Sequence, residues 1–202
     1  MRIVVLASGG IDSSVMMSLL KKESHETLPL FVDYGQLARE KEWLACQRIC
    51  HFLELRPHRI DVSGFGKSIP SGITNDRLDI EANAFLPARN LLFLTLGAAY
   101  AHTKSSSFVA LGLLANPIFP DQTIDFLHTA EKSISTALGE DVKVLAPLIS
   151  LDKRDTLRLA IKYELPLNLM SSCHSGGESP CGHCISCRER IAAEKSLSDA
   201  IS

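Results

Sequence analysis

The residues best suited to chemistry stand near the N-terminus, where Ser8-Gly9-Gly10-Ile11-Asp12-Ser13 follows the first hydrophobic run of the chain. Two glycines let backbone N–H groups approach an anion, and a helix that begins here adds positive potential at the same place. The loop is not a Walker A motif, because no lysine precedes its last serine. An aspartate in such a loop suits Mg²⁺ or the metal of a bound pyrophosphate. The alternative is an ordinary turn in which Ser13 or Ser14 caps the helix. The pattern favours a phosphate site made by Ser8, Gly9, Gly10, Asp12 and Ser13.

A second chemical group lies near the C-terminus, where four thiols follow one another with seven, two and two residues between them. This spacing suits a tetrahedral zinc site, because each two-residue step brings successive sulfurs to one side of a tight turn. An iron–sulfur cluster is the competing interpretation, but the spacing differs from the usual ferredoxin runs. Four thiolates leave no open metal position, so the zinc is expected to be structural. Its predicted ligands are Cys173, Cys181, Cys184 and Cys187.

Other residues of the same types receive plainer interpretations. His174 and His183 stand beside the thiols and could replace one of them, but with four cysteines present both histidines are expected to face solvent. Cys46 and Cys50 are four residues apart on the hydrophobic face of a predicted helix. We expect them to be small, buried core residues.

Composition sets the broad class of the protein. A chain of 202 residues fits one domain with an appendage, and 46% hydrophobic residues can build a core. The formal net charge of −2 provides no basic field, so direct binding to nucleic acid is not expected. The longest hydrophobic stretch, residues 91–101, is about half of the ~20 residues that a membrane span needs. The initial hydrophobic run is too short for a signal peptide. We therefore expect a soluble cytoplasmic protein without a membrane partner.

Hydrophobic strands alternate with helices along most of the sequence. The helix at 91–100 is expected to be buried, because it is hydrophobic on nearly all faces. Residues 63–85 lack a clean period and are expected to form a lid or a disordered flap. Alternating strands and helices indicate a parallel sheet covered on both faces. Strands are predicted at 2–6, 28–34, 57–62, 108–111 and 142–146, and helices at 39–53, 91–100, 123–138 and 153–163.

In such a sheet, ligands bind beyond the carboxyl ends of the strands. Ser8, Asp33 and Gly112 all fall at those ends. The organisation predicted is a nucleotide-binding α/β domain at residues 1–168 with a zinc-binding segment, 169–202, packed on it.

The run from Ser8 to Ser13 resembles the PP-loop of the ATP pyrophosphatases, which split ATP into AMP and pyrophosphate to adenylate a substrate. Together with the four-cysteine knuckle, it is similar to the 7-cyano-7-deazaguanine synthases of queuosine biosynthesis. The resemblance covers nearly the whole chain. Its further motifs are Asp33-Tyr34-Gly35-Gln36, Phe85-Leu86-Pro87-Ala88-Arg89-Asn90, Pro147-Leu148 followed by Lys153, and the run from Ser172-Cys173 to Cys187-Arg188.

The resemblance implies a doubly wound, five-stranded parallel sheet of the adenine nucleotide α hydrolase type. It also implies ATP-dependent conversion of 7-carboxy-7-deazaguanine and ammonia to the nitrile, with Mg²⁺ accompanying ATP. The residues expected to act in catalysis are Asp12, Arg89 and Lys153. Arg89 would contact phosphate or carboxylate, and Lys153 would neutralise phosphate as a point charge. The alternative for both cations is a surface salt bridge. A homodimer is a candidate assembly.

The sequence departs from the family pattern at the wall expected to face the second substrate. Ala115 stands where the family usually has an acidic residue, and Phe119 and Gln122 replace Tyr and Cys. Ala88 replaces Gly before Arg89, and His174 replaces Tyr. If the substrate is guanine-like, Asp121 or a backbone carbonyl must take over the lost contact.

These departures keep other functions open. The first is a relative that couples the adenylated deazapurine acid to another amine, such as one on a protein. A tRNA-thiolating or amidating enzyme usually needs a basic extension or free catalytic cysteines, and neither is seen here. A zinc-ribbon regulator that only senses ATP is disfavoured by the intact PP-loop.

Overall fold

The β-branched and other hydrophobic runs form five short parallel strands. The computed structural model describes residues 1–199, so the last three residues of the predicted zinc-binding segment lie outside the described part. The strand order is β3-β2-β1-β4-β5, and every neighbouring pair is parallel. The strands are β1 (Arg2–Leu6), β2 (Glu26–Asp33), β3 (His58–Asp61), β4 (Phe108–Ala110) and β5 (Lys143–Leu145).

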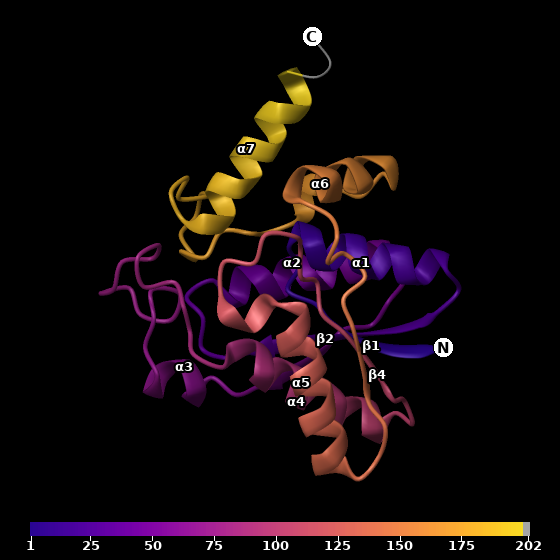
Figure 1. Cartoon of the computed structure of the whole chain (residues 1–202). Helices are drawn as coiled ribbons and strands as arrows, with labels where there is room; N and C mark the ends of the chain where they lie inside the picture. The colour runs from indigo at the N-terminus through magenta and orange to yellow at the C-terminus, as the bar shows by residue number, and fades with distance from the viewer. Residues whose placement is uncertain (200–202) are drawn as a thin grey trace.

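Helices cover both faces of this sheet, as Figure 1 shows. The first hydrophobic cluster contains residues of α1, α2, α6 and α7, and the second contains residues of α4 and α5. Alternate β1 side chains supply both clusters: Ile3 and Val5 enter the first, Val4 and Leu6 the second. The helices are α1 (Ile11–Lys22), α2 (Arg39–Phe52), α3 (Gly64–Ser68), α4 (Arg89–Thr103), α5 (Ile124–Leu138), α6 (Lys153–Lys162) and α7 (Ile185–Asp199), with 3₁₀ turns at Pro120–Gln122 and Leu167–Leu169.

The strand order decides where a ligand can bind. The chain moves outward from β1 through β2 to β3, then returns to the other side of β1 to form β4 and β5. Loops that leave β1 and β4 therefore diverge and open a crevice at the carboxyl edge of the sheet. The predicted doubly wound parallel sheet is confirmed, and its switch point lies directly at the glycine-rich loop.

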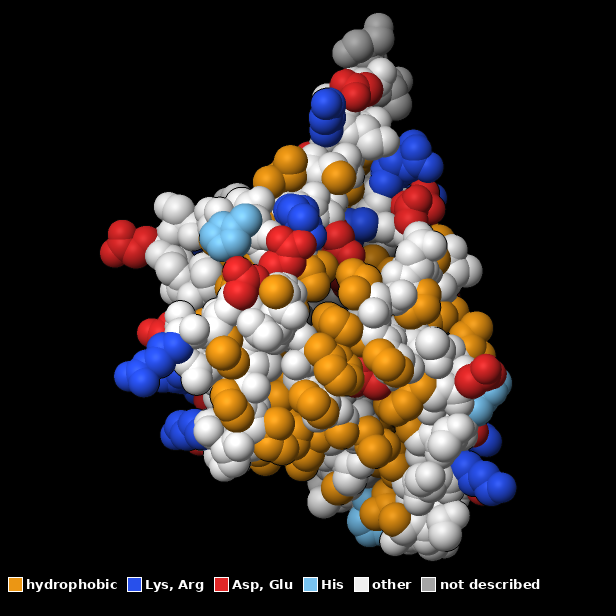
Figure 2. Space-filling model, turned by 60° about the vertical axis from the view of Figure 1, so that its left-hand side comes forward, with side chains coloured by type: hydrophobic (Ala, Val, Ile, Leu, Met, Phe, Trp, Pro, Cys, Tyr) orange, Lys and Arg blue, Asp and Glu red, His pale blue; other side chains and the backbone are white. Residues whose placement is uncertain are grey.

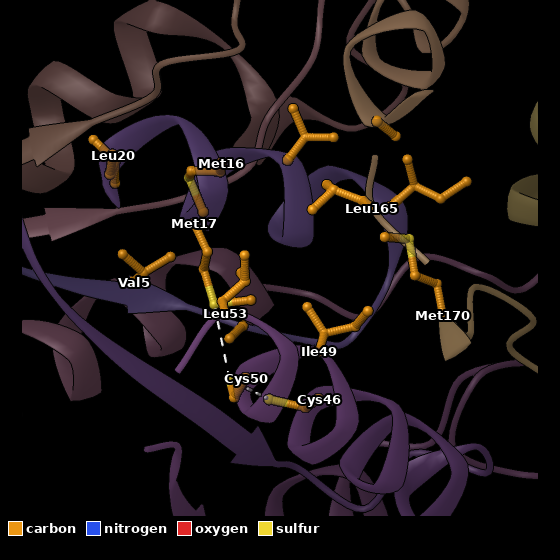
Figure 3. Close-up of a cluster of buried hydrophobic side chains, with 14 of the residues drawn as sticks. Val5, Met16, Met17, Leu20, Cys46, Ile49, Cys50, Leu53, Leu165 and Met170 are labelled. Atoms are coloured by element: carbon orange, nitrogen blue, oxygen red, sulfur yellow. Dashed lines mark hydrogen bonds between the residues drawn. The ribbon is translucent and has the colours of Figure 1, made fainter. Parts of the chain in front are cut away.

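Cys46 and Cys50 belong to the first core cluster, as expected. Figure 3 shows them on α2, facing the sulfur of Met17 on α1. The two Sγ atoms are 4.0 Å apart, and Cys50 Sγ is 4.0 Å from Met17 Sδ. Both cysteines are fully buried. They therefore pack as small hydrophobic residues and offer no accessible thiol.

The expectation that the helix at residues 91–100 is buried needs correction. In α4, Leu94, Ala98 and Ala101 are buried, but Leu91 is 38% exposed, so only one face of this helix is covered. The composition was misleading because the outer face is also hydrophobic. Figure 2 shows that hydrophobic side chains gather on the molecular surface as well, over the lower half of the face drawn there. The homodimer stays a prediction.

Residues 63–85 are packed against the protein and do not form an unstructured flap. They contain α3, and Gly72 N donates a 2.7 Å hydrogen bond to Asn83 O. Ile73 and Ala84 are buried in the second core cluster. This segment therefore contributes to the structural wall of the crevice, while a lid movement stays a prediction. Within residues 1–199, no helix has the length and hydrophobicity to cross a membrane.

Candidate active site

The glycine-rich loop adopts a conformation that only small residues permit. Gly9 has φ of +77°, and a Cβ there would lie 2.7 Å from Glu42 O and closer still to Cys46 N. The loop therefore lies directly against α2. Gly10 begins α1 without a side-chain cap, whereas the Ser13 and Ser14 hydroxyls donate to its carbonyl oxygen. The alternative in which a serine caps the helix is wrong. The positive end of α1 faces the crevice without a side-chain cap.

A lysine from the far end of the chain meets this loop. Lys153 Nζ lies 2.8 and 2.7 Å from the two carboxylate oxygens of Asp12. Lys153 is the first residue of α6, whose start is capped by the Asp152 side chain. The side chains of Lys153 and Asp12 are 13% and 27% exposed, so this pair is partly buried in the crevice and is not a surface salt bridge. A triphosphate would meet a fixed cation here.

The first cavity occupies about 270 Å³ between the glycine-rich loop and the ends of the strands. Its floor is hydrophobic, with Leu6 of β1, Leu30 of β2 and Leu111, which directly follows β4. Arg89 lines its wall, 5.9 Å from the Phe93 ring, and forms no salt bridge within the described residues. A hydrophobic floor beside an anion site suits a nucleotide.

The cavity also contains a buried carboxyl group that sequence reasoning missed. Gln36 Nε2 donates to Glu42 Oε2 at 2.9 Å, and Gln36 Oε1 accepts from Tyr34 N at 3.0 Å. Burial raises the pKa of Glu42 to about 7, opposed by the hydrogen bond from Gln36 and the charge of Arg89. Asp33 points elsewhere, to Arg59 Nη2 at 2.6 Å. The Asp33–Gln36 motif was the only signal in the sequence, because Glu42 looked like a surface position of α2.

The four predicted metal ligands come together. The Sγ atoms of Cys173, Cys181, Cys184 and Cys187 all lie within 4.8 Å of one another. Cys181 N donates to Cys173 Sγ, and Cys184 N donates to Cys181 Sγ, each at 3.3 Å. Burial raises the pKa of Cys173, but hydrogen bonds from Ser175 and Cys181 outweigh it and lower the pKa to about 6. Burial raises the pKa of Cys184 and that of Cys187. Four sulfur atoms this close together fit a single tetrahedral metal ion.

The expectation that His174 faces solvent is wrong. It lines the first cavity, and its Nδ1 is buried with no hydrogen-bond partner in residues 1–199. Burial lowers its pKa to about 4, and the charges of Arg89 and Lys153 act in the same direction. Ser172 Oγ, on the same wall, is also buried and unpartnered within the described chain. His183 is exposed, as expected. Two orphaned polar atoms therefore face a cavity that a ligand would fill.

A second cavity of about 540 Å³ adjoins the first. The Asp12–Lys153 pair, Gly112 and Glu189 line both. Residues 114–117, which include Ala115, line only the second cavity, together with Ala192 and Ser196 of α7. The helix α7 was not anticipated, because the region after Tyr163 was judged only by its cysteines. The Asp12–Lys153 pair thus lies between two cavities whose other lining residues differ.

Comparison with known proteins identifies the family. A family model described as Queuosine biosynthesis protein QueC matches residues 2–198. The chain belongs to the QueC family. The 7-cyano-7-deazaguanine synthase of Acetivibrio thermocellus is 32% identical over 207 residues, covering 96% of this chain and 93% of that protein. The synthase of Caldicellulosiruptor saccharolyticus is 32% identical, covering 98% and 92%.

Solved structures support the fold. An NMN synthetase from Francisella tularensis superimposes with a TM-score of 0.59 at 16% identity, covering 98% of this chain and 76% of that one. An NH3-dependent NAD synthetase from Campylobacter jejuni gives 0.54 at 19% identity, covering 83% and 66%. The expected fold of the adenine nucleotide α hydrolase type is confirmed.

The departures from the QueC-family pattern can now be placed. Ala88 has φ of +59°, so the residue at this usual glycine position adopts a left-handed conformation at the start of α4. Asp121 is buried, and its Oδ2 accepts from Asn90 N at 3.1 Å. Its carboxylate therefore accepts from a free N–H in the first turn of α4, and Asp121 lines neither cavity, so the cavity lining does not support Asp121 as the replacement for an acidic residue at position 115.

Proposed function

We propose that this chain uses ATP to activate 7-carboxy-7-deazaguanine and converts it with ammonia to 7-cyano-7-deazaguanine. Membership of the QueC family and relatives named as 7-cyano-7-deazaguanine synthases support the substrate. The observation that carries the proposal is the Asp12–Lys153 pair, held at the uncapped N-terminus of α1 beside a cavity with a hydrophobic floor.

The chemistry requires good leaving groups more than a covalent nucleophile. A carboxylate oxygen attacks the α-phosphate of ATP and pyrophosphate leaves. Ammonia then displaces AMP and gives the amide. A second ATP activates the amide oxygen, and loss of AMP with two protons gives the nitrile. Each oxygen of the acid thus departs on AMP, and positioning with charge neutralisation supplies most of the acceleration.

Each residue of the first cavity has a proposed task. Backbone N–H groups of Gly9 and Gly10, with the hydroxyls of Ser8 and Ser13, hold the pyrophosphate. When the nucleotide binds, Lys153 releases the carboxylate of Asp12 and neutralises the negative charge of a phosphate group instead. The orphaned Ser172 and His174 would gain partners from the ligand. Arg89 approaches the α-phosphate or the substrate carboxylate.

Two metals complete the proposal. Asp12, a partly exposed carboxylate beside the anion site, is the residue that would hold Mg²⁺, which supplies charge neutralisation to bound ATP. The four clustered cysteines would hold one structural zinc ion, which stabilises the fold of the C-terminal segment. Neither zinc nor its knuckle takes part in the chemical steps. We also propose that residues 1–168 form the nucleotide-binding unit and that the zinc-binding segment closes it.

A second function is favoured by one observation. Ala115 leaves the second cavity without the acidic residue of the family pattern, so the activated acid could be delivered to an amine other than ammonia. The test is to incubate the zinc-loaded chain with ATP, Mg²⁺, ammonium and 7-carboxy-7-deazaguanine. AMP with a nitrile of the expected mass supports the first function. AMP with the deazapurine attached to another amine supports the second, and absence of AMP overturns both.

A further inference from the structure

The second cavity contains one carboxylate that no hydrogen bond holds within the described residues. Glu189 stands on α7, two residues after the buried Cys187, and lines both cavities. It is half-buried, and within residues 1–199 its carboxylate forms no hydrogen bond and no close ion pair, although the charges of Lys153 and Asp12 act on it through space. A side chain held at the junction of two cavities without a protein partner is available to a ligand.

The neighbouring acidic groups are already engaged. Asp12 accepts from Lys153, and Asp152 accepts from the backbone N–H of Asp155 at the start of α6. Glu42 of the first cavity accepts from Gln36. Glu189 is therefore the carboxylate with free acceptor capacity in the second cavity, among the described residues that line it.

The opposite wall of this cavity needs such an acceptor. Residues 113–118 contribute mostly hydrophobic side chains, and Ala115 uses its own backbone N–H to reach Leu151 O at 2.8 Å. A guanine-like ring presents two adjacent donors, the ring N1–H and the 2-amino group. Without a matching acceptor, burying these donors costs binding free energy.

A carboxylate matches the two donors in geometry as well as in charge. Its two oxygens can accept both N–H groups in parallel, and bonds to an ionised acceptor are stronger than neutral ones. A cavity of about 540 Å³ is of the size that holds a bicyclic ligand. Ammonia would fill only a small part of it.

We propose that Glu189 accepts hydrogen bonds from the donor edge of the deazapurine acid and so takes over the task of the acidic residue absent at Ala115. The inference rests on the proposed function, because that function supplies the ligand. In this arrangement the recognising carboxylate stands on α7, the helix that follows the cysteine cluster, and not in the loop after β4. Glu189 is thus a specificity-determining residue, and the zinc-binding segment forms part of the substrate site.

The test compares the zinc-loaded wild-type chain with Glu189→Gln and Glu189→Leu by AMP release at varied acid, ATP and ammonium. Both variants are expected to raise KM for the acid by about 10- to 100-fold, since one or two bonds to a buried acceptor are lost. KM values for ATP and ammonium should stay within about twofold. The matched control is Glu194→Gln, because Glu194 lies on the same helix, pairs with Arg190 and lines neither cavity.

A ligand analogue tests the same contact from the other side. The acid without its 2-amino group should bind the wild-type chain at least about tenfold more weakly than the complete acid, whereas Glu189→Gln should no longer distinguish the two. Direct calorimetric binding of both acids, with zinc content and circular dichroism checked, covers variants that turn over poorly.

An unchanged KM for the acid in both variants would overturn the inference. So would a rise in KM for ammonium alone, which would assign Glu189 to the acceptor amine. A wild-type chain that forms no AMP with the acid argues instead against the proposed function.

Discussion

The two cavities are built by different means. In the first, the proposed anion site consists of backbone groups, a helix N-terminus and the Asp12–Lys153 pair, all set by the topology of the sheet. In the second, the walls are side chains of the loop after β4 and of α7. Exchanging those side chains disturbs few backbone contacts. On the proposed function, binding of ATP therefore depends on the fold itself, whereas specificity for the acid can change with a few substitutions.

The largest expected effect tests the anion site. Asp12→Ala should lower AMP formation by about 10³-fold or more and leave the fold intact, because the triphosphate loses the group proposed to hold its Mg²⁺. AMP release should be measured at saturating ATP and acid. Asp125→Ala, in the first turn of α5, is the matched control. Nearly normal AMP release by Asp12→Ala would contradict the proposal that the first cavity holds the ATP site, and with it the comparison of the two cavities.

The cysteine cluster should matter most for the second cavity, because Cys184 and Cys187 stand at the start of α7. Cys184→Ser is expected to reduce bound zinc well below one per chain and to lower the free energy of unfolding by about 4 kcal/mol. Elemental analysis and chemical denaturation measure the two quantities. Cys50→Ser, in the core outside the cluster, should keep its zinc. Iron with visible absorption, or a well-folded chain without metal, would contradict the zinc assignment.

Gly9→Ala probes how tightly the first cavity is tied to the fold. The new methyl group would meet the backbone of α2 at a positive φ, so we expect a loss of about 3 kcal/mol or more in stability. Gly139 has a similar φ of +70°, but a Cβ there meets nothing within 4 Å. Gly139→Ala should therefore cost only about 1 kcal/mol. Equal losses in thermal or chemical denaturation would show that the close approach of α2 is unimportant.

The smallest effect concerns the proton of Glu42. Its pKa is about 7 in the folded chain, against 4.5 as the ordinary value, so folding favours the protonated form. This contribution is complete below about pH 4.5 and is lost as pH rises through about 7, up to about 3 kcal/mol. Glu42→Gln cannot ionise and should flatten the decline. Chemical denaturation of the zinc-loaded wild-type and Glu42→Gln chains from pH 5 to 8 measures the free energy of unfolding. If this free energy changes with pH in the same way for both chains, the raised pKa of Glu42 is contradicted.

Local pattern was sufficient for several features. The hydrophobic run and glycines around Ser8–Ser13 predicted a strand, a turn and a helix start, because these depend on residues close in sequence. The regular spacing of the cysteines predicted their convergence for the same reason. Composition misled at α4, since it cannot show which hydrophobic face a sheet will cover. The presence of four cysteines misled at His174, because the number of available ligands cannot show which side chains line a cavity.

The sequence by itself determined the parallel sheet covered on both faces, the glycine-rich turn after its first strand and the cysteines that cluster, because hydrophobic periodicity, glycine freedom and thiol spacing act over a few residues. Tertiary structure decided which groups meet. Asp12 and Lys153 are 141 residues apart, and Glu189 reaches the loop that contains Ala115 only through the packing of α7. Burial also moved the pKa of Glu42, because desolvation depends on the atoms that surround a carboxyl group and not on its neighbours in sequence.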